Sequence, residues 1–379
     1  MFEYRRLGDV VTLLNGRAYK QNELLKDGKY PVLRVGNFFS NRDWYYSNME
    51  LDDDKYCDNG DLLFAWSASF GPRIWDGGKA IYHYHIWKLV LSNEIWREYL
   101  YFYLLSVAER VKNEGHGITM IHTTKADMEN RIIPIPNMSA QKQIAATLDK
   151  LQSVIAKRKQ QLEKLDQLVK ARFVEMFGDV KLNSKGWRVG TLSDFFEVKG
   201  GKRIPKGMSY SKEKTNHPYL RASDMKNETI LDDDIHYISE EVYEYIKRYT
   251  VASGDIYLTN VGVNLGMAGV IPQKYDGANL TENAVKLVPK TNCFVGQFIA
   301  MYMNSPGIQE LILERKMVVG VPKLAIFRIE TMPLIIPPVE IQNEFLEFRN
   351  QIDKSKFAVQ KALDEAQLLF DSLMQEYFG

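Results

Sequence analysis

Two long segments of the chain place apolar residues at alternating steps of three and four, the spacing of a coiled-coil helix. In the first segment the seam residues are Ile144, Leu148, Leu151, Ile155, Leu162 and Leu165. In the second they are Ile352, Val359, Leu363 and Phe370. Since neither segment has an internal glycine or proline, each predicts one continuous helix, and about 37 residues at roughly 1.5 Å each give a rod of about 55 Å.

Each long segment follows a stretch with a different pattern. Short apolar runs typical of strands, such as residues 61–66 and 255–259, alternate with turns that contain Gly and Asn. Each stretch also has one helical run, at residues 95–112 and 296–315. The sequence therefore predicts an α/β fold with two similar domains of mixed sheet and two long helices. The predicted boundaries are 1–138 and 179–338 for the domains, and 139–178 and 339–379 for the helices.

The two halves of the chain are related by an internal duplication. Residues 31–34 recur as residues 218–221, an offset of 187, whereas Gln141 recurs as Gln342, an offset of 201. The Phe-Gly pairs that end the two long segments keep the offset of 201. This pattern indicates domains whose loops differ in length, each followed by a rigid element of fixed length.

Charge favours pairing of the two predicted helices with each other. Residues 139–178 carry eight basic and four acidic side chains, and residues 340–379 carry four basic and eight acidic ones. Opposite net charge and matched length suit a paired coiled coil, although each charged face could simply be solvated. Because two like units in tandem close on each other only with antiparallel helices, we expect a pseudo-two-fold arrangement with a domain at each end.

Composition narrows the class of protein. The chain is 45% hydrophobic and 26% charged with a net charge of +1, which neither supports nor excludes a nucleic-acid partner. Its two cysteines, Cys57 and Cys293, lie far apart in sequence and suit a reducing cytoplasm better than a disulfide framework. The sequence has no apolar run of about 18 residues and no signal-peptide pattern at its start, so we expect a cytoplasmic protein without a membrane span.

Motifs of catalysis are missing from the sequence. Residues 200–202 lack the first glycine and the final Ser or Thr of a phosphate-binding loop, and no glycine fingerprint for a nucleotide cofactor occurs. Residues 314–316 match only half of a nuclease site. His83 and His85 could offer two metal ligands on one face of a strand, but ordinary hydrogen-bonded histidines are the favoured interpretation. We therefore expect no catalytic or metal site, and a binding or scaffold role.

Basic and small polar residues gather in the predicted loops of both domains. Lys and Arg can neutralise phosphates, and Arg and Asn can bond base edges bidentately, although each residue alone could be an ordinary solvated one. The candidate DNA-binding residues of the first domain are Arg17, Tyr19, Lys20, Arg34, Asn37, Ser67, Ser69, Arg73, Thr119 and Lys125. Those of the second domain are Lys199, Lys202, Arg203, Lys206, Arg221, Ser223, Asn260, Asn264, Lys316 and Lys323.

The loops of the two domains can be set against each other. Residues 15–18 align with residues 199–202, and residues 67–69 align with residues 260–262, yet their side chains differ. Different side chains present different donors and acceptors. We therefore expect the two domains to differ in what they bind.

The order of a variable domain, a proline-rich stop, a glutamine at the helix start and a long rod, given twice, resembles the specificity subunits of type I restriction–modification enzymes. The strings that carry the resemblance are Ile-Ile-Pro-Ile-Pro at 132–136 with Gln141, and Leu-Ile-Ile-Pro-Pro at 334–338 with Gln342. Residues 7–16 also look like the start of such a target-recognition domain. The resemblance covers essentially the whole chain.

The resemblance implies two target-recognition domains, each reading one half of a split, asymmetric site in double-stranded DNA. It also implies that the paired helices set the spacer and dock methyltransferase subunits, expected to be two, with restriction subunits joining through the complex. S-adenosylmethionine and ATP with Mg²⁺ would be bound by those partners, so we expect no cofactor in this chain and no methylation, cleavage or NTPase activity when it is alone.

The alternative function is that of a coiled-coil adaptor joining two protein-binding domains. Such an adaptor would share the long helices but would show no salt-dependent affinity for DNA. An autonomous nuclease or methyltransferase is disfavoured by the missing motifs.

Overall fold

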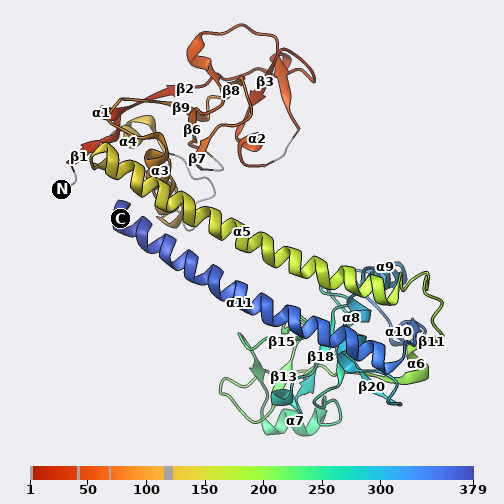
Figure 1. Cartoon of the computed structure of the whole chain (residues 1–379). Coiled ribbons are helices and arrows are strands. Elements are labelled where there is room, and N and C mark those ends of the chain that lie inside the picture. The colour runs from red at the N-terminus through yellow and green to blue at the C-terminus, as the bar shows by residue number, and fades with distance from the viewer. Residues whose placement is uncertain (1–2, 41–42, 68–69, 115–122) are drawn as a thin grey trace. The chain divides into compact units, whose positions relative to one another are not determined.

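The computed structural model describes residues 3–40, 43–67, 70–114 and 123–379. The chain divides into unit 1, residues 1–161 and 358–379, and unit 2, residues 162–357. The two long helices, α5 (Met138–Phe177) and α11 (Val339–Phe378), are continuous as the sequence predicts (Figure 1). The first begins in unit 1 and ends in unit 2, and the second does the reverse.

The described part of unit 1 contains three sheets. The first is antiparallel, with the order β2 (Val11–Asn15), β9 (Ile86–Leu91), β6 (Leu62–Ala65) and β7 (Gly71–Ile74). The second has a parallel pair at its centre, in the order β4 (Tyr45–Ser47), β3 (Tyr30–Leu33), β8 (Ala80–Tyr82) and β5 (Tyr56–Cys57). The third pairs β1 (Glu3–Arg6) with β10 (Ile132–Ile135). The shorter α-helices are α1 (Leu7–Val10), α2 (Val35–Phe39), α3 (Arg97–Glu114) and α4 (Lys125–Glu129), with 3-10 turns at Gln21–Glu23 and Asp53–Lys55.

Unit 2 repeats this topology. Its antiparallel sheet has the order β12 (Phe196–Gly200), β20 (Ala284–Pro289), β17 (Ile256–Thr259) and β18 (Ala268–Val270). Its mixed sheet has the order β16 (His236–Tyr237), β13 (Pro218–Leu220) and β19 (Asn279–Leu280), in which β13 and the edge strand β19 are parallel. The outer pair is β11 (Val189–Thr191) with β23 (Pro333–Ile335). Two hairpins, β14 (Met225–Lys226) with β15 (Thr229–Ile230) and β21 (Met317–Val319) with β22 (Val321–Lys323), complete the strands.

The remaining helices of unit 2 are α6 (Leu192–Phe195), α7 (Glu240–Ile246), α8 (Gly296–Asn304), α9 (Pro306–Arg315) and α10 (Ile326–Glu330), with a 3-10 turn at Gln273–Tyr275. The sequence predicts one helix over 296–315, which the structure divides at Ser305. Pro306 is the first residue of α9, a position that suits proline, whereas inside a helix it would remove a hydrogen bond and clash with the preceding turn. The mixed α/β fold and the internal duplication are confirmed.

The long helices run antiparallel inside unit 2. Asp166 of α5 pairs with Lys356 of α11 at 2.6 Å, whereas Arg172, further along α5, pairs with Glu344, nearer the start of α11, at 3.0 Å. Phe345 packs edge-on against the rings near the end of α5, with a centroid distance of 5.5 Å to Phe177. The end of α5 is therefore fixed against the beginning of α11.

In unit 1 the end of α11 packs against α3. The ring of Phe378 lies 5.2 Å from that of Tyr99 and 6.1 Å from that of Tyr103, and Phe370 lies 6.2 Å from Phe102. Of the predicted seam residues across the two units, the buried ones are Ile144, Leu148, Ile155, Val359, Leu363 and Phe370. The half-buried ones are Leu151, Leu162, Leu165 and Ile352.

A buried glutamine fixes the start of each long helix to its own unit. The side-chain amide of Gln141 donates to the carbonyl oxygens of Pro136 and Glu94, both at 2.9 Å, and its oxygen accepts from the Trp96 amide at 2.8 Å. Gln342 makes the equivalent bonds in unit 2, to Pro337, Cys293 and Val295. A buried amide that satisfies three backbone groups explains why glutamine follows both proline stops.

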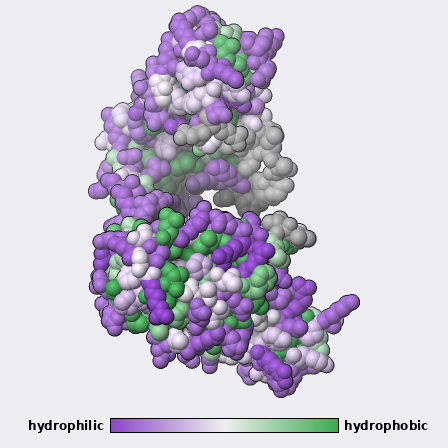
Figure 2. Space-filling view, turned by 90° about the vertical axis from the view of Figure 1, so that its right-hand side faces the viewer, coloured by the Kyte–Doolittle hydropathy of each residue, from purple (hydrophilic) through white to green (hydrophobic). Residues whose placement is uncertain are grey.

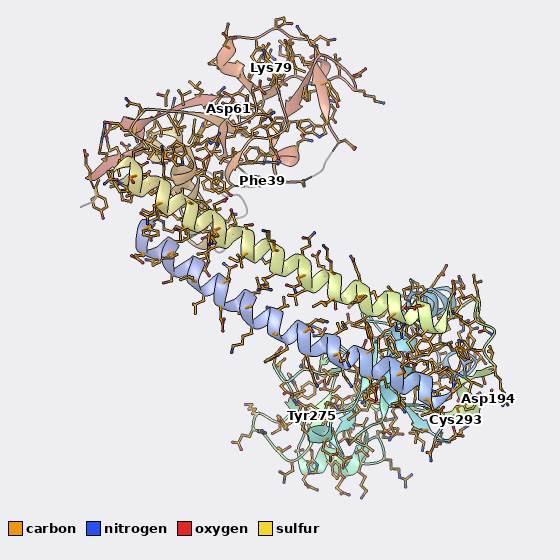
Figure 3. All side chains as sticks on the ribbon, viewed as in Figure 1. Phe39, Asp61, Lys79, Asp194, Tyr275 and Cys293 are labelled. Carbon is orange, nitrogen blue, oxygen red and sulfur yellow. The ribbon has the colours of Figure 1, made fainter. Side chains whose placement is uncertain are left out.

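Paired charges recur in the antiparallel sheets as well. Lys88 meets Asp61, which is labelled in Figure 3, at 2.7 Å in unit 1, and Lys286 meets Asp255 at 3.0 Å in unit 2. Figure 2 shows hydrophilic residues over most of the visible face, with smaller hydrophobic areas between them. Among the helices that the structure describes, none combines the length and apolar character needed to cross a membrane.

Candidate nucleic-acid interface

In unit 1 a glycine brings the end of β2 against the turn between β8 and β9. The Gly16 amide donates to the Ile86 carbonyl at 3.3 Å. A Cβ atom at Gly16 would lie 2.4 Å from the carbonyl oxygens of both Tyr82 and His83. Because real Cβ atoms do not approach oxygen so closely, only glycine permits this contact. We call residues 83–85 the glycine-backed turn of unit 1.

Unit 2 has the same arrangement at Gly201. Its amide donates to the Ala284 carbonyl at 3.1 Å, and a Cβ atom there would lie 2.0 Å from the Thr281 carbonyl oxygen. Residues 281–283 are therefore the glycine-backed turn of unit 2. The structure matches Gly16 with Gly201, so the sequence alignment of Gly16 with Gly200 is corrected by one residue.

The β6 strand and its counterpart β17 show the same one-residue correction. The Trp66 amide donates to the His85 carbonyl at 3.0 Å, and the Asn260 amide donates to the Asn283 carbonyl at 2.9 Å. Asn260 thus corresponds to Trp66, where the sequence comparison had set it against Ser67. Hydrogen bonds define this register better than loop sequences of unequal length.

The glycine-backed turn of unit 1 carries uncharged aromatic side chains. The ring of Tyr84 lies 3.9 Å from that of His85 and 6.1 Å from that of Trp66. Burial lowers the pKa of His83 to about 4, assisted by the nearby charges of His85 and Arg34, and burial also lowers the pKa of His85. At neutral pH both rings are therefore neutral, and each offers one donor and one acceptor.

The glycine-backed turn of unit 2 lines a groove of about 610 Å³ in which basic side chains outnumber acidic ones. Arg203, Lys206 and Arg221 line it together with one acidic residue, Glu282. The Arg203 guanidinium donates to the Glu282 carboxylate at 2.5 Å. The same position of the fold is therefore aromatic in one unit and charged in the other.

Several predicted residues of unit 1 are engaged within the protein. Arg17 forms a two-point ion pair with Glu23, at 2.7 and 3.0 Å. Arg73 donates to the Phe38 carbonyl at 2.7 Å and to Asp76 at 2.8 Å. Asn37 and Ser67 are both 8% exposed and Tyr19 is half-buried. These side chains build the domain as the structure stands, and contact with DNA would require Arg17 and Arg73 to change partners.

Other predicted residues of unit 1 face solvent. Lys20 and Arg34 are exposed, and the Arg34 guanidinium lies over the Tyr45 ring at 5.0 Å. Lys125 pairs with Glu129 at 3.6 Å, one turn along α4. Ser69 and Thr119 lie outside the described residues.

In unit 2 the structure turns Arg221 and Asn260 inward. The Arg221 guanidinium donates to Asp224 at 2.7 Å and to Asp234 at 3.0 Å, and the Ser223 hydroxyl donates to Asp224 at 3.1 Å. The Asn260 side chain is 5% exposed, and its amide nitrogen lies 3.4 Å from the Leu324 carbonyl. Arg221 and Ser223 line the groove, whereas Asn260 is not part of its lining.

The basic side chains of the Lys199–Lys206 segment are exposed. Lys199 pairs with Glu197 at 2.8 Å, Lys202 lies over the Tyr249 ring at 5.8 Å, and the Arg203 side chain is 77% exposed. Of the other predicted residues, Lys323 is exposed on β22, Lys316 and Asn264 are half-buried, and the Asn264 carbonyl accepts from the Thr259 hydroxyl.

Sequence reasoning missed Tyr84, Glu282 and Asn283 in the two glycine-backed turns, and also Trp66, whose ring lies near that of Tyr84. Their shared position depends on the pairing of strands that are far apart in the chain, which no local motif signals. His83 and His85 lie in the turn after β8 and not on one face of a strand as predicted. Among the described residues no group of three or more His, Cys, Asp or Glu side chains could hold a metal ion.

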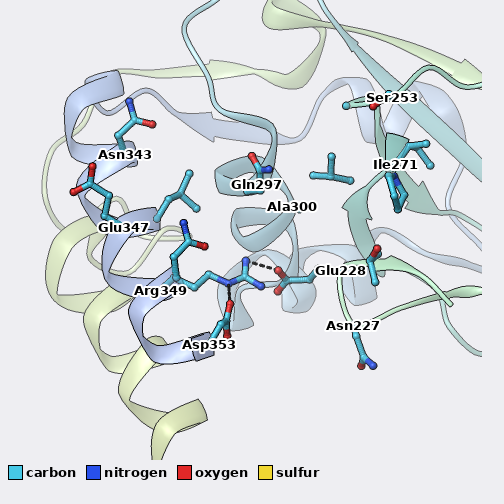
Figure 4. A pocket seen from close by; sticks show the side chains of 16 residues that line it. Asn227, Glu228, Ser253, Ile271, Gln297, Ala300, Asn343, Glu347, Arg349 and Asp353 are labelled. Atoms are coloured by element: carbon cyan, nitrogen blue, oxygen red, sulfur yellow. Dashed lines mark ion pairs between the residues drawn. The ribbon is translucent and has the colours of Figure 1, made fainter. Parts of the chain in front are cut away.

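A hollow of about 780 Å³ in unit 2 lies between the β14–β15 hairpin, β18 and α11 (Figure 4). Within it Arg349 of α11 pairs with Glu228 at 2.6 Å and with Asp353 at 3.4 Å. Asn227 and Glu228 adopt positive φ angles of 52° and 61°, which L residues rarely do. The turn of the β14–β15 hairpin is thus held against α11, so these charged residues have a structural role.

Comparisons with known proteins agree with this duplicated architecture. A family model described as type I restriction modification DNA specificity domain matches residues 1–167 and again 184–366. The chain is 20% identical over 405 residues to the EcoBI specificity subunit of Escherichia coli, covering 97% of this chain and 83% of that protein. It is 26% identical over 275 residues to the MjaVIII specificity subunit of Methanocaldococcus jannaschii, covering 68% and 63%.

Two solved structures share the fold over the full length of the chain. The S subunit of a type I restriction–modification system from M. genitalium matches with a TM-score of 0.58 at 17% identity, covering 100% of this chain and 96% of that one. A chain from a study of complex assembly and conformational transition in the type I R-M system matches with a TM-score of 0.64 at 15% identity, covering 100% and 97%.

Proposed function

Because this chain belongs to the family of type I restriction modification DNA specificity domains, we propose that each of its two domains reads one half of a split DNA site. It is a specificity subunit, a non-catalytic component that works in a complex with methyltransferase subunits, restriction subunits and DNA. The observation that carries the half-site proposal is the glycine-backed turn, which has one backbone geometry in both units and different side chains in each.

The chemistry of the two turns supports half-sites that differ. Unit 1 offers neutral imidazoles and the Tyr84 ring, which suit base edges and the thymine methyl group. Unit 2 offers Arg203, Lys206 and Glu282, which suit phosphates, guanine and exocyclic amino groups. A site read by two such surfaces is not palindromic.

The paired long helices are proposed to set the spacer between the half-sites and to dock two methyltransferase subunits. In support, apolar side chains remain uncovered on both helices, with Phe357 of α11 75% and Val174 of α5 55% exposed. S-adenosylmethionine and ATP with Mg²⁺ would be bound by the partner subunits. We place the assembled complex in the cytoplasm, with its DNA.

The test compares the purified chain with the chain reconstituted with its methyltransferase subunits. We expect DNA binding that weakens as the salt concentration rises. Only the reconstituted complex, and not the purified chain, should methylate a split sequence. A coiled-coil adaptor would give neither result, since its two domains would bind proteins. Absence of both sequence-specific methylation and salt-dependent DNA binding in the folded complex would exclude the proposed function.

A further inference from the structure

The groove of unit 2 contains an acidic side chain where a DNA-binding surface would ordinarily avoid one. Glu282 stands at the centre of the glycine-backed turn, among Arg203, Lys206 and Arg221. A carboxylate repels the phosphate backbone, so it weakens sequence-independent binding. Its presence in a basic groove therefore calls for a specific partner.

The structure holds this carboxylate in place from several sides. The Thr281 hydroxyl donates to it at 3.2 Å, and the Tyr219 hydroxyl lies 3.5 Å away while donating to the Lys202 carbonyl at 2.8 Å. The Glu282 side chain is only 28% exposed. It is thus a preorganised acceptor and not a freely moving surface group.

Glu282 is also charged at neutral pH. Burial acts to raise the pKa of its carboxyl, but the hydrogen bond from Arg203 and that from its own backbone amide outweigh burial and lower it. A charged carboxylate is an acceptor only. In the grooves of DNA, the donors it can meet are exocyclic amino groups, cytosine N4 or adenine N6 in the major groove.

We propose that Glu282 is a specificity-determining residue, whose carboxylate accepts a hydrogen bond from the exocyclic amino group of a base in the half-site read by unit 2. This inference rests on the function proposed above. Arg203 is released to donate to a neighbouring guanine, which presents two acceptors to a guanidinium. The exchange is inexpensive because the Arg203 side chain is 77% exposed, and ion pairs so exposed contribute little to stability.

Tyr84 occupies the corresponding place in unit 1. The turns align through their backbone bonds, since the His83 amide donates to the Leu33 carbonyl at 2.9 Å and the Thr281 amide donates to the Leu220 carbonyl at 3.0 Å. Tyr84 follows His83 and Glu282 follows Thr281, so the two residues occupy equivalent positions. The Tyr84 hydroxyl both donates and accepts, whereas a charged carboxylate only accepts, so we expect the two half-sites to differ at this point.

The experiment uses the full chain in complex with its methyltransferase subunits and a DNA library randomised in both half-sites, with methylated sequences read out. For Glu282→Gln we expect discrimination to fall by about tenfold to hundredfold at one base pair of one half-site, where the wild type requires cytosine, because Gln suits adenine N6 and N7 better than cytosine N4. The base required there identifies which amino group is read. The other half-site should not change.

Two further variants separate this role from a general effect of charge. Glu282→Asp keeps the charge but withdraws it by one methylene, so it should lose the same discrimination. Glu244→Gln breaks another exposed ion pair of unit 2, with Lys247 at 2.6 Å, and should leave the site unchanged. Thermal unfolding checks that each variant is folded. If Glu282→Gln does not fold, Glu282→Asp serves as the test.

Unchanged base preference in both Glu282 variants would overturn the inference, as would tighter binding to all sequences alike in Glu282→Gln with none of the discrimination lost. Either result would leave the split-site function standing. Failure of the wild-type complex to methylate a defined sequence would instead overturn the proposed function itself.

Discussion

At the scale of single residues, the partner a side chain has within the protein determines whether it is available to DNA. Arg221 is held by Asp224 and Asp234, and Arg17 by Glu23. Arg203 has a partner too, but its side chain is exposed and its ion pair is weak. The three arginines look alike in sequence, yet only the third can exchange its partner at low cost.

The two neighbouring glycines at the end of β12 give a matched test of close packing. A Cβ atom at Gly201 would lie 2.0 Å from the Thr281 carbonyl oxygen, whereas at Gly200 its nearest neighbour would be Ile326 at 3.5 Å. We expect Gly201→Ala to lower the free energy of unfolding by about 1–3 kcal/mol and Gly200→Ala to change it little. Denaturant unfolding of the two variants checks this, and equal effects would contradict it.

His83 should make the stability of the protein sensitive to mild acid. Burial, with His85 and Arg34 nearby, lowers the pKa of its ring from an ordinary 6.5 to about 4. The unfolded chain therefore binds the proton first, so the stability present above pH 6.5 is lost as the pH falls toward 4.

The measurement is the denaturant midpoint at stepped pH for the wild type and for His83→Gln. Relative to the variant, the wild type should lose stability across that interval and change no further below it. Parallel pH curves for the two proteins would show that His83 is accessible to protons in the folded state.

At the scale of elements, the long helices were predictable because a single periodic pattern extends over about ten turns without glycine or proline. The helix over 296–315 was not, because apolar periodicity continues across Ser305 while Pro306 starts a new helix. Strand pairing was also out of reach, since the correspondence of Gly16 with Gly201 follows from hydrogen bonds between residues far apart. The inward-facing Arg221 was missed because Asp234 reaches it from thirteen residues away.

Leu148 and Leu168 allow the packing of α5 to be measured with one substitution type. Leu148 is fully buried, whereas Leu168 is 46% exposed on the same helix. Leu148→Ala should therefore cost about 2–5 kcal/mol of unfolding free energy, and Leu168→Ala no more than about 0.5 kcal/mol. Calorimetry or denaturant unfolding distinguishes them. If both cost the same, the buried seam is not what stabilises this helix.

At the scale of the whole molecule, each unit contains one long helix that starts in it and another that ends in it. Unit 1 keeps the end of α11 through the rings of Tyr99, Tyr103 and Phe378. Any exchange of the first domain must therefore preserve the aromatic face of α3, or it will release the end of α11 as well as change the loops. A test of one half-site per domain that exchanges the first domain must therefore keep these ring contacts.

The proposal of one half-site per domain predicts the outcome of such an exchange. Residues 1–138 are replaced by the matching domain of a relative, with the aromatic face of α3 retained, and the methylated sequence is mapped for the complex. The half-site read by unit 1 should change because its turn carries new donors and acceptors. The other half-site and the spacer should stay, because Glu282, Arg203 and both long helices are untouched. A change in both half-sites, or in neither, would show that the domains do not read DNA independently.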